Sequence, residues 1–210
     1  LGKFALRGCS SLTQLRIPSS LTQINEYAFS GCTSLIFVTI PSSITYIGEY
    51  SFSNCSALPY LLIPDSVTGI GKDAFLGCSS LEEIILPSSI ALLEGYIFFE
   101  CTKLSKITIP PSVCTIGRSC FYECSSIVQI IIPSSVESIS DYAFSECISL
   151  RDISLPSSLK SIGDYAFNKC SSLEEITIPS SVESIGPSAF RECSALLQIE
   201  IPSSVTKINE

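Results

Sequence analysis

The 210-residue sequence contains no histidine, no methionine and no tryptophan. Histidine is the commonest general base and a frequent zinc ligand, so its absence excludes Ser-His and Cys-His catalysis and weakens any zinc hypothesis. Basic residues are also few, and the formal charge of −8 disfavours nucleic acid and anionic membranes, which bind basic surfaces. Apolar runs such as Ile130-Ile131-Ile132 are far shorter than the ~20 residues of a membrane-spanning helix. We therefore expect no nucleic-acid partner and no membrane insertion of this segment.

What the sequence does contain is an internal repeat of 23 residues. Cysteine recurs from Cys9 to Cys193 and proline from Pro18 to Pro202, and from Phe29 to Phe190 a phenylalanine stands three residues before each cysteine. A single unit cannot bury its own apolar face, so the units must stack and share one core. Residues 1–210 are therefore predicted to form one solenoid domain of nine 23-residue repeats.

The unit Cys170–Glu192 illustrates the predicted coil. Its first inward residues have the spacing L-x-x-I-x-I of the strand in leucine-rich repeats: Leu173, Ile176 and Ile178. Pro179 ends the strand, Ser180-Ser181 turns the chain, and Gly186 is expected to give backbone freedom at a second corner. The stretch that ends at Phe190 is predicted to be a helical turn with this ring in the core. The expected fold is a leucine-rich-repeat solenoid of the α/β horseshoe type, with a parallel β-sheet on the concave side and short strands, turns and helical turns on the convex side.

The consensus I-P-S-S-V-x-S-I-G-x-Y-A-F-x-x-C-S-S-L-x-x-I resembles the BspA-like leucine-rich repeats, which are typical of the surfaces of mucosal bacteria and of the protist Trichomonas. The resemblance covers all nine units, and the serine- and cysteine-rich composition is more similar to the protist members. It implies a cell-surface or secreted protein that is not an enzyme, has no cofactor, and acts in adhesion or recognition. Host or matrix proteins, neighbouring cell-surface proteins or glycans are the implied partners. Because the chain starts and stops in phase with the repeat, we also expect an uncapped fragment of a longer chain.

Eleven cysteines permit three interpretations: inert buried thiols, disulfide bridges or a metal site. Parallel Cβ vectors on stacked coils hold the Cβ atoms farther apart than the ~3.8 Å that a disulfide prefers, and zinc normally takes histidine as well as cysteine. We favour inert buried thiols. Cys120 occupies an alanine position and is predicted to fill the core. Cys114 occupies an outward position and is a candidate for cross-linking two chains; self-association through the uncapped ends is a second predicted mode.

Two further motifs are open to a functional interpretation. Asp152 and Glu175 are predicted to lie side by side on adjacent strands at ~5 Å, a spacing that suits paired catalytic carboxylates. We favour the alternative, a solvated acidic face. Asn54-Cys55-Ser56 is an N-glycosylation signal whose central residue belongs to the cysteine repeat.

The outward positions of the predicted strand vary from unit to unit, whereas the flanking scaffold barely changes. In the second to fourth coils they gather an apolar cluster: Ile36, Phe37, Tyr60, Leu62 and Ile85. From the fourth coil onward the surface becomes mixed and acidic, with Glu83, Lys106, Asp152 and Glu175 as charged candidates. An exposed apolar patch with aromatic anchors marks an interaction site, so the concave sheet is predicted to bind the partner. Two alternatives remain: strand-favouring residues or covering segments could explain the cluster, and the domain could be a stalk or spacer that presents another domain.

Overall fold

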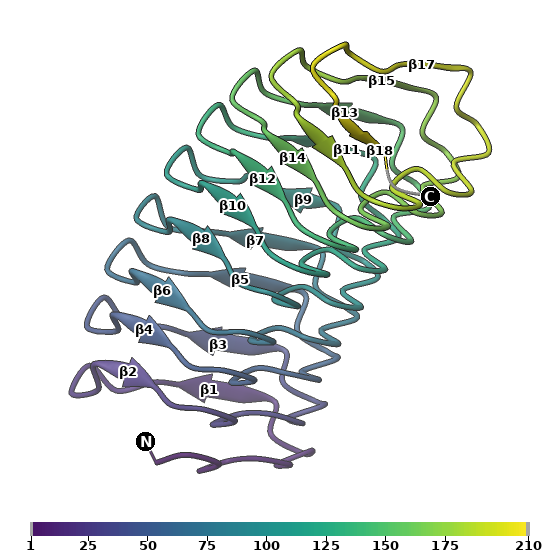
Figure 1. Ribbon diagram of the computed structural model, residues 1–210. Helices are drawn as coiled ribbons and strands as arrows, with labels where there is room; N and C mark the ends of the chain where they lie inside the picture. Colours follow the sequence, from purple (N-terminus) through teal and green to yellow (C-terminus); the bar gives the residue numbers. More distant parts are fainter. Residues whose placement is uncertain (1, 209–210) are drawn as a thin grey trace.

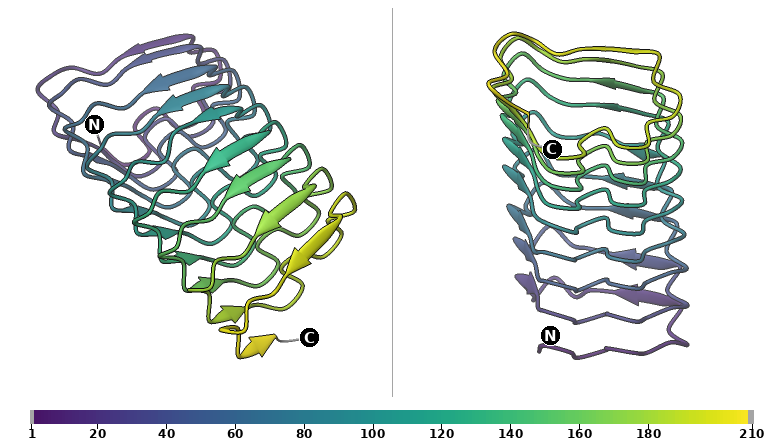
Figure 2. Two further views of the ribbon diagram at one scale, coloured as in Figure 1. Left: turned by 90° about the horizontal axis from the view of Figure 1, so that it is seen from above. Right: turned by 45° about the vertical axis from the view of Figure 1, so that its right-hand side comes forward.

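A computed structural model of the chain describes residues 2–208. The chain winds into a stack of similar coils that rises from the N-terminus to the C-terminus (Figure 1). Each coil adds one strand to each of two rows, and the rows lie on opposite sides of the stack (Figure 2). The predicted leucine-rich-repeat solenoid is therefore confirmed, including short strands outside the main parallel sheet.

The first row contains the L-x-x-I-x-I motif of each unit. Its strands are β1 (Gln14–Arg16), β3 (Phe37–Thr39), β5 (Tyr60–Leu62), β7 (Glu83–Ile85), β9 (Lys106–Ile107), β11 (Gln129–Ile131), β13 (Asp152–Ser154), β15 (Glu175–Thr177) and β17 (Gln198–Glu200). They run parallel, and each residue pairs with the residue 23 positions later, as Tyr60 does with Glu83. The hydrogen-bonded ladder is divided into four segments, β1–β3, β5–β7–β9, β11–β13 and β15–β17.

The second row consists of two-residue strands. They are β2 (Gln23–Ile24), β4 (Tyr46–Ile47), β6 (Gly69–Ile70), β8 (Leu92–Leu93), β10 (Thr115–Ile116), β12 (Ser138–Ile139), β14 (Ser161–Ile162), β16 (Ser184–Ile185) and β18 (Lys207–Ile208). β2–β4–β6 form one sheet, and β8 to β18 form a second sheet of six strands. Because two residues show no alternation of apolar and polar side chains, the sequence predicted short strands outside the main sheet without giving their bounds.

One continuous apolar core runs the length of the stack, and a column of phenylalanines lies along it. Phe29 to Phe167, one in each of seven successive coils, are 0% exposed, and neighbouring rings lie 5.2–5.8 Å apart between centroids. Stacked rings at this separation stabilise each other beyond their burial. Phe190 continues the column but is only partly buried.

The cysteine column confirms the prediction of free, buried thiols. Cys32, Cys55, Cys78, Cys101, Cys124, Cys147 and Cys170 are buried and unpaired. Each thiol donates a hydrogen bond to a backbone carbonyl of the preceding coil, as Cys124 Sγ does to Phe98 O at 3.2 Å. Burial raises the pKa of the Cys124 thiol, which keeps it protonated and able to donate. Cys120 is also buried and Cys114 is exposed, as their positions predict.

The predicted helical turns are wrong, since no residue between 2 and 208 is helical. The stretch before each cysteine consists of tight turns in which amide groups alternate between two acceptors. Tyr142 N and Phe144 N donate to Asp164 O and Ala166 O of the next coil, each at 2.8 Å, whereas Ala143 N donates to Ser140 O within its own coil. The left-handed conformation of Tyr142 (φ 57°) interrupts any helical winding. The predicted α/β horseshoe type is therefore wrong in this detail, because the coils between residues 2 and 208 consist of short strands and turns without helices.

Glycine at the second corner also has a different role from the predicted one. Gly186 and its counterparts at this position have no positive φ, so backbone freedom is not what they supply. A Cβ atom on Gly48 would lie 2.7 Å from the backbone carbon of Asn25 in the preceding coil. Glycine is needed there because successive coils approach each other too closely for a side chain.

Candidate partner-binding face

The outward side chains of the first row, with the residue that precedes each strand, form a surface that we call the variable face. Burial alternates along each strand: Tyr60 and Leu62 are exposed, whereas Leu61 between them is buried. This is the period of two expected of a strand with one face in the core and the other in solvent. The inward residues hold the coil together, and the outward ones are available for contact.

The predicted apolar cluster lies on this face. Its exposed fractions are 51% for Ile36, 50% for Phe37, 44% for Tyr60, 54% for Leu62 and 44% for Ile85. Leu62 pairs with Ile85 in the β5–β7 ladder, and β3 contacts β5, so the five residues share one surface that we call the apolar patch. Exposed apolar residues also extend beyond it, to Val128 and Ile131 at 51% and 69%. Both occupy outward positions of the first row, but the predicted cluster did not include them.

The charged candidates occupy the middle and the C-terminal part of the variable face. Glu83 is half-buried and pairs with Tyr60 on one side and exposed Lys106 on the other. Asp152 is exposed and its Oδ2 accepts a hydrogen bond from Gln129 Nε2 at 2.9 Å. Glu175 is exposed and pairs with Gln198.

Asp152 and Glu175 lie on neighbouring strands, but β13 and β15 belong to different ladder segments. The two residues line one surface groove and are both exposed. Nothing in this groove buries either carboxylate. The geometry therefore does not give Asp152 or Glu175 the water-excluding environment on which carboxylate catalysis depends.

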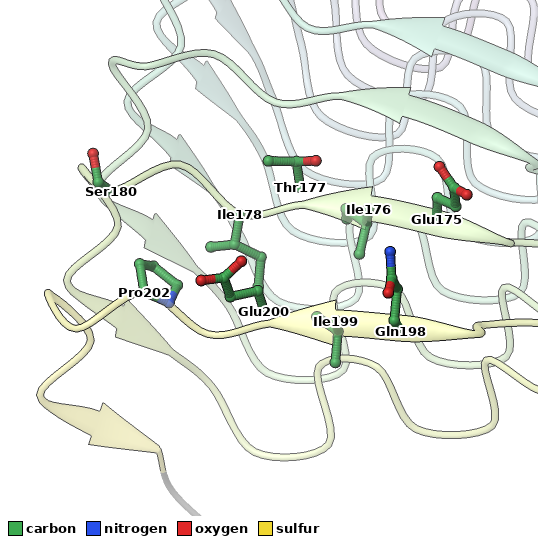
Figure 3. Close-up of a pocket in the computed structure, with 9 residues that line it drawn as sticks. All are labelled: Glu175, Ile176, Thr177, Ile178, Ser180, Gln198, Ile199, Glu200 and Pro202. Atoms are coloured by element: carbon green, nitrogen blue, oxygen red, sulfur yellow. The ribbon is translucent and has the colours of Figure 1, made fainter.

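Surface grooves run between neighbouring strands of the variable face. They lie between β7 and β9, β9 and β11, β13 and β15, and β15 and β17. Figure 3 shows the last of these: Glu175 and Gln198 stand next to each other on the outer side of the sheet, and Glu200 lies farther along β17. The variable face is therefore not flat: hollows lie between its neighbouring strands.

The remaining candidate features are also placed by the structure. Asn54 is exposed in a left-handed conformation (φ 57°), and Cys55 beside it is buried. Among residues 2–208, no group of three or more His, Cys, Asp or Glu side chains could hold a metal ion. Within the same range no helix has the length and apolarity to cross a membrane. Of the ends expected to self-associate, Leu1 lies outside the described residues.

Comparisons with known proteins identify the repeat. The model of the BspA type leucine rich repeat region matches residues 1–128 and 114–210. Among solved structures, a leucine-rich cell surface protein of Faecalibacterium prausnitzii is 33% identical, with a TM-score of 0.64 over 94% of this chain and 62% of that protein. A leucine-rich repeat protein of T. pallidum is 26% identical, with a TM-score of 0.70 over 87% of this chain and 77% of that protein. A leucine-rich repeat protein of Eubacterium ventriosum is also 26% identical, with a TM-score of 0.61 over 96% of this chain and 48% of that protein.

The chain spans about three fifths of the F. prausnitzii protein, 62% of its length. No curated protein sequence matches. The family match nevertheless covers the whole chain, and the similar structures share its stacked strands. The chain therefore belongs to the BspA-type leucine-rich-repeat proteins.

Proposed function

We propose that this chain is an extracellular adhesion or recognition module that binds a protein partner through the variable face. The observation that carries the proposal is the apolar patch, whose five residues are each between 44% and 54% exposed. Contiguous apolar surface of this kind costs solubility and is typical of interaction sites, where aromatic side chains supply much of the binding energy. The name of the F. prausnitzii protein, a cell surface protein, supports an extracellular location for this chain.

The variable face is also the part of the coil that folding constrains least. Phenylalanine, cysteine and the inward aliphatic residues recur because each has a structural partner in a neighbouring coil. The outward residues have no such repeated partner and are free to differ. Recognition is the role that a variable, exposed and partly apolar surface serves best.

The test is a pull-down from host-cell and extracellular-matrix extracts with the double variant Phe37→Ser, Tyr60→Ser. Loss of two aromatic anchors should weaken a cognate partner's binding by at least about tenfold. The matched control is Tyr46→Ser, Leu92→Ser, which removes two side chains that are 42% and 40% exposed on the opposite row. We expect proteins that bind the parent chain and the control to be lost from the double variant. Equal capture by all three chains would show that the patch is only scaffold.

A structural stalk is the second candidate function. Its support is the single core that runs through the whole stack, which makes the domain a rigid spacer. At ~4.8 Å per strand, nine coils separate the two ends by about 40 Å. A stalk predicts that surface presentation of a neighbouring domain depends on the number of coils and is indifferent to Phe37→Ser, Tyr60→Ser. Cell binding that changes with the double variant at constant coil number would contradict it.

A further inference from the structure

We propose that the variable face holds its partner as one extended polypeptide segment lying across the strands, along the axis of the stack. Apolar side chains of this segment cover β5 to β11, and lysine or arginine side chains cover β13 to β17. The inference rests on the proposed function, and it adds the shape, the chemistry and the spacing of the partner.

The grooves define the path. The groove between β7 and β9 and the one between β9 and β11 share Ile107 and Thr108. The grooves on either side of β15 share Glu175 and Thr177. Each pair therefore flanks a single strand, β9 or β15, so the hollows follow one another along the axis of the stack, with the hydrogen-bonded pair β11–β13 between the two pairs.

The two halves of this path have different chemistry. The first half exposes Leu62, Ile85 and Ile131 at 54%, 44% and 69%. The second half exposes Asp152, Glu175 and Glu200 among mostly polar side chains, and Leu197, 82% exposed next to β17, is its large apolar residue. Burial of apolar surface favours binding of an apolar segment to the first half. Attraction between opposite charges favours binding of a cationic segment to the second half.

The carboxylates of the second half are not neutralised within the described part of the chain. None of the ion pairs between residues 2 and 208 uses Asp152, Glu174, Glu175 or Glu200. Arg151 is the only basic residue that the outward positions of these last three coils contribute. Parallel stacking repeats the negative charge at short intervals, so the potential over β13 to β17 attracts a basic side chain. A partner with apolar residues alone would place no positive charge opposite the carboxylates of this half of the face.

The dimensions favour an extended segment over a helix. Outward residues two apart on one strand are separated by only ~7 Å, whereas a helix with its side chains is ~10 Å wide. Three strand spacings separate Leu62 from Ile131 and three more separate Ile131 from Glu200, about 14 Å each at ~4.8 Å per spacing. At ~3.3 Å per residue, an extended segment of about nine residues covers the path, with its apolar and basic centres about four residues apart.

The test is selection from a displayed library of random peptides of about twelve residues against the whole chain, long enough to cover the path. Selected peptides are then measured against three variants. Glu175→Lys, Glu200→Lys reverses the acidic half, and Leu62→Ser, Ile85→Ser removes the apolar half. Glu137→Lys, Glu183→Lys makes the same change of charge at exposed positions next to the second row and serves as the control. Thermal unfolding confirms that each variant folds.

We expect selected peptides to carry an apolar and a basic cluster about four residues apart, and to lose at least about tenfold in affinity in each of the first two variants. Affinity for the control should stay within about twofold, and salt should weaken binding to the parent chain. Peptides without basic residues that depend only on Leu62 and Ile85 would overturn the inference and leave the proposed function standing. Peptides that depend only on the carboxylates would also overturn it. Binding that is insensitive to both variants, or no selection at all, would contradict both proposals.

Discussion

Replacing Phe121 by leucine removes one ring from the middle of the phenylalanine column. The side chain is 0% exposed, and its ring centroid lies 5.4 Å from that of Phe98 and 5.2 Å from that of Phe144. Each aromatic contact contributes about 0.5–1.5 kcal/mol beyond area burial, and the smaller leucine leaves a cavity worth about 0.5 kcal/mol more. We therefore expect the free energy of unfolding to fall by about 2–3 kcal/mol.

The same substitution at Phe190 is the matched control. This ring is partly buried, and its described ring contact is with Phe167 at 5.4 Å. In a solenoid each coil is stabilised by its neighbours, so a site with one ring contact should lose about half as much free energy as a site with two. Urea unfolding followed by far-ultraviolet circular dichroism measures both variants, with the slope checked because terminal coils can unfold separately. Equal losses at the two sites, or a loss below about 1 kcal/mol at Phe121, would refute the stacking argument.

Three further predictions concern the other repeated positions. A thiol reagent should label Cys9 and Cys114 in the folded chain, because both are exposed, and should label the buried cysteine column, spaced by 23 residues from Cys32 to Cys170, only after unfolding. Burial raises the pKa of Cys193 to about 11, which should slow the labelling of this thiol at neutral pH. Rapid labelling of the buried column in the folded chain would contradict the structure. Ser158→Ala should cost about 1 kcal/mol because its hydroxyl donates to Val136 O at 2.7 Å. Ser157→Ala, at an exposed position, should change the free energy of unfolding by no more than about 0.5 kcal/mol. If urea unfolding gives the same loss for both serine variants, the inter-coil hydrogen bond contributes nothing. Burial raises the pKa of Asp73 above its usual value of 3.8, against the opposing effects of Tyr50 and Lys72, so ionised Asp73 opposes folding at neutral pH. Asp73→Asn should therefore stabilise the chain at neutral pH, and the gain should disappear as the pH falls through the raised pKa toward 3.8; a gain that persists in acid would contradict this cause.

The repeat allowed much of the fold to be predicted from the sequence. Inward aliphatic residues, the buried phenylalanine and the buried cysteine all follow from a fixed period, because stacking forces equivalent residues into one column. The outward placement of Phe37 and Tyr60 follows from the alternation of a strand. Exposed Cys114 and buried Cys120 follow from the same reasoning, since each occupies a position whose exposure the other coils define.

What escaped prediction depends on contacts between coils rather than within one. In eight coils, from Ser43 to Ser204, the serine two positions after the strand-ending proline donates to a carbonyl of the preceding coil at 2.6–2.7 Å, as Ser135 does to Val113 O, which a turn motif does not reveal. The turns around Tyr142 resembled a helix because the apolar spacing is similar, but half of their amides donate to the next coil. Glycine at position 48 is explained by the closeness of Asn25, which no single unit contains.

The same division explains why the variable face can be altered without unfolding the stack. Phe37 and Tyr60 are about half exposed, and the hydrogen bonds of their strands come from the backbone, so exchanging their side chains leaves the ladder intact. Substitutions at such positions usually change stability by no more than about 0.5 kcal/mol, far less than removal of Phe121. Because stability resides in the repeated columns, a loss of binding in the variants of the variable face reports on recognition and not on folding. A solenoid of this kind can therefore change its partner by substitution at outward positions while the repeated contacts of the buried columns and the backbone ladder are retained.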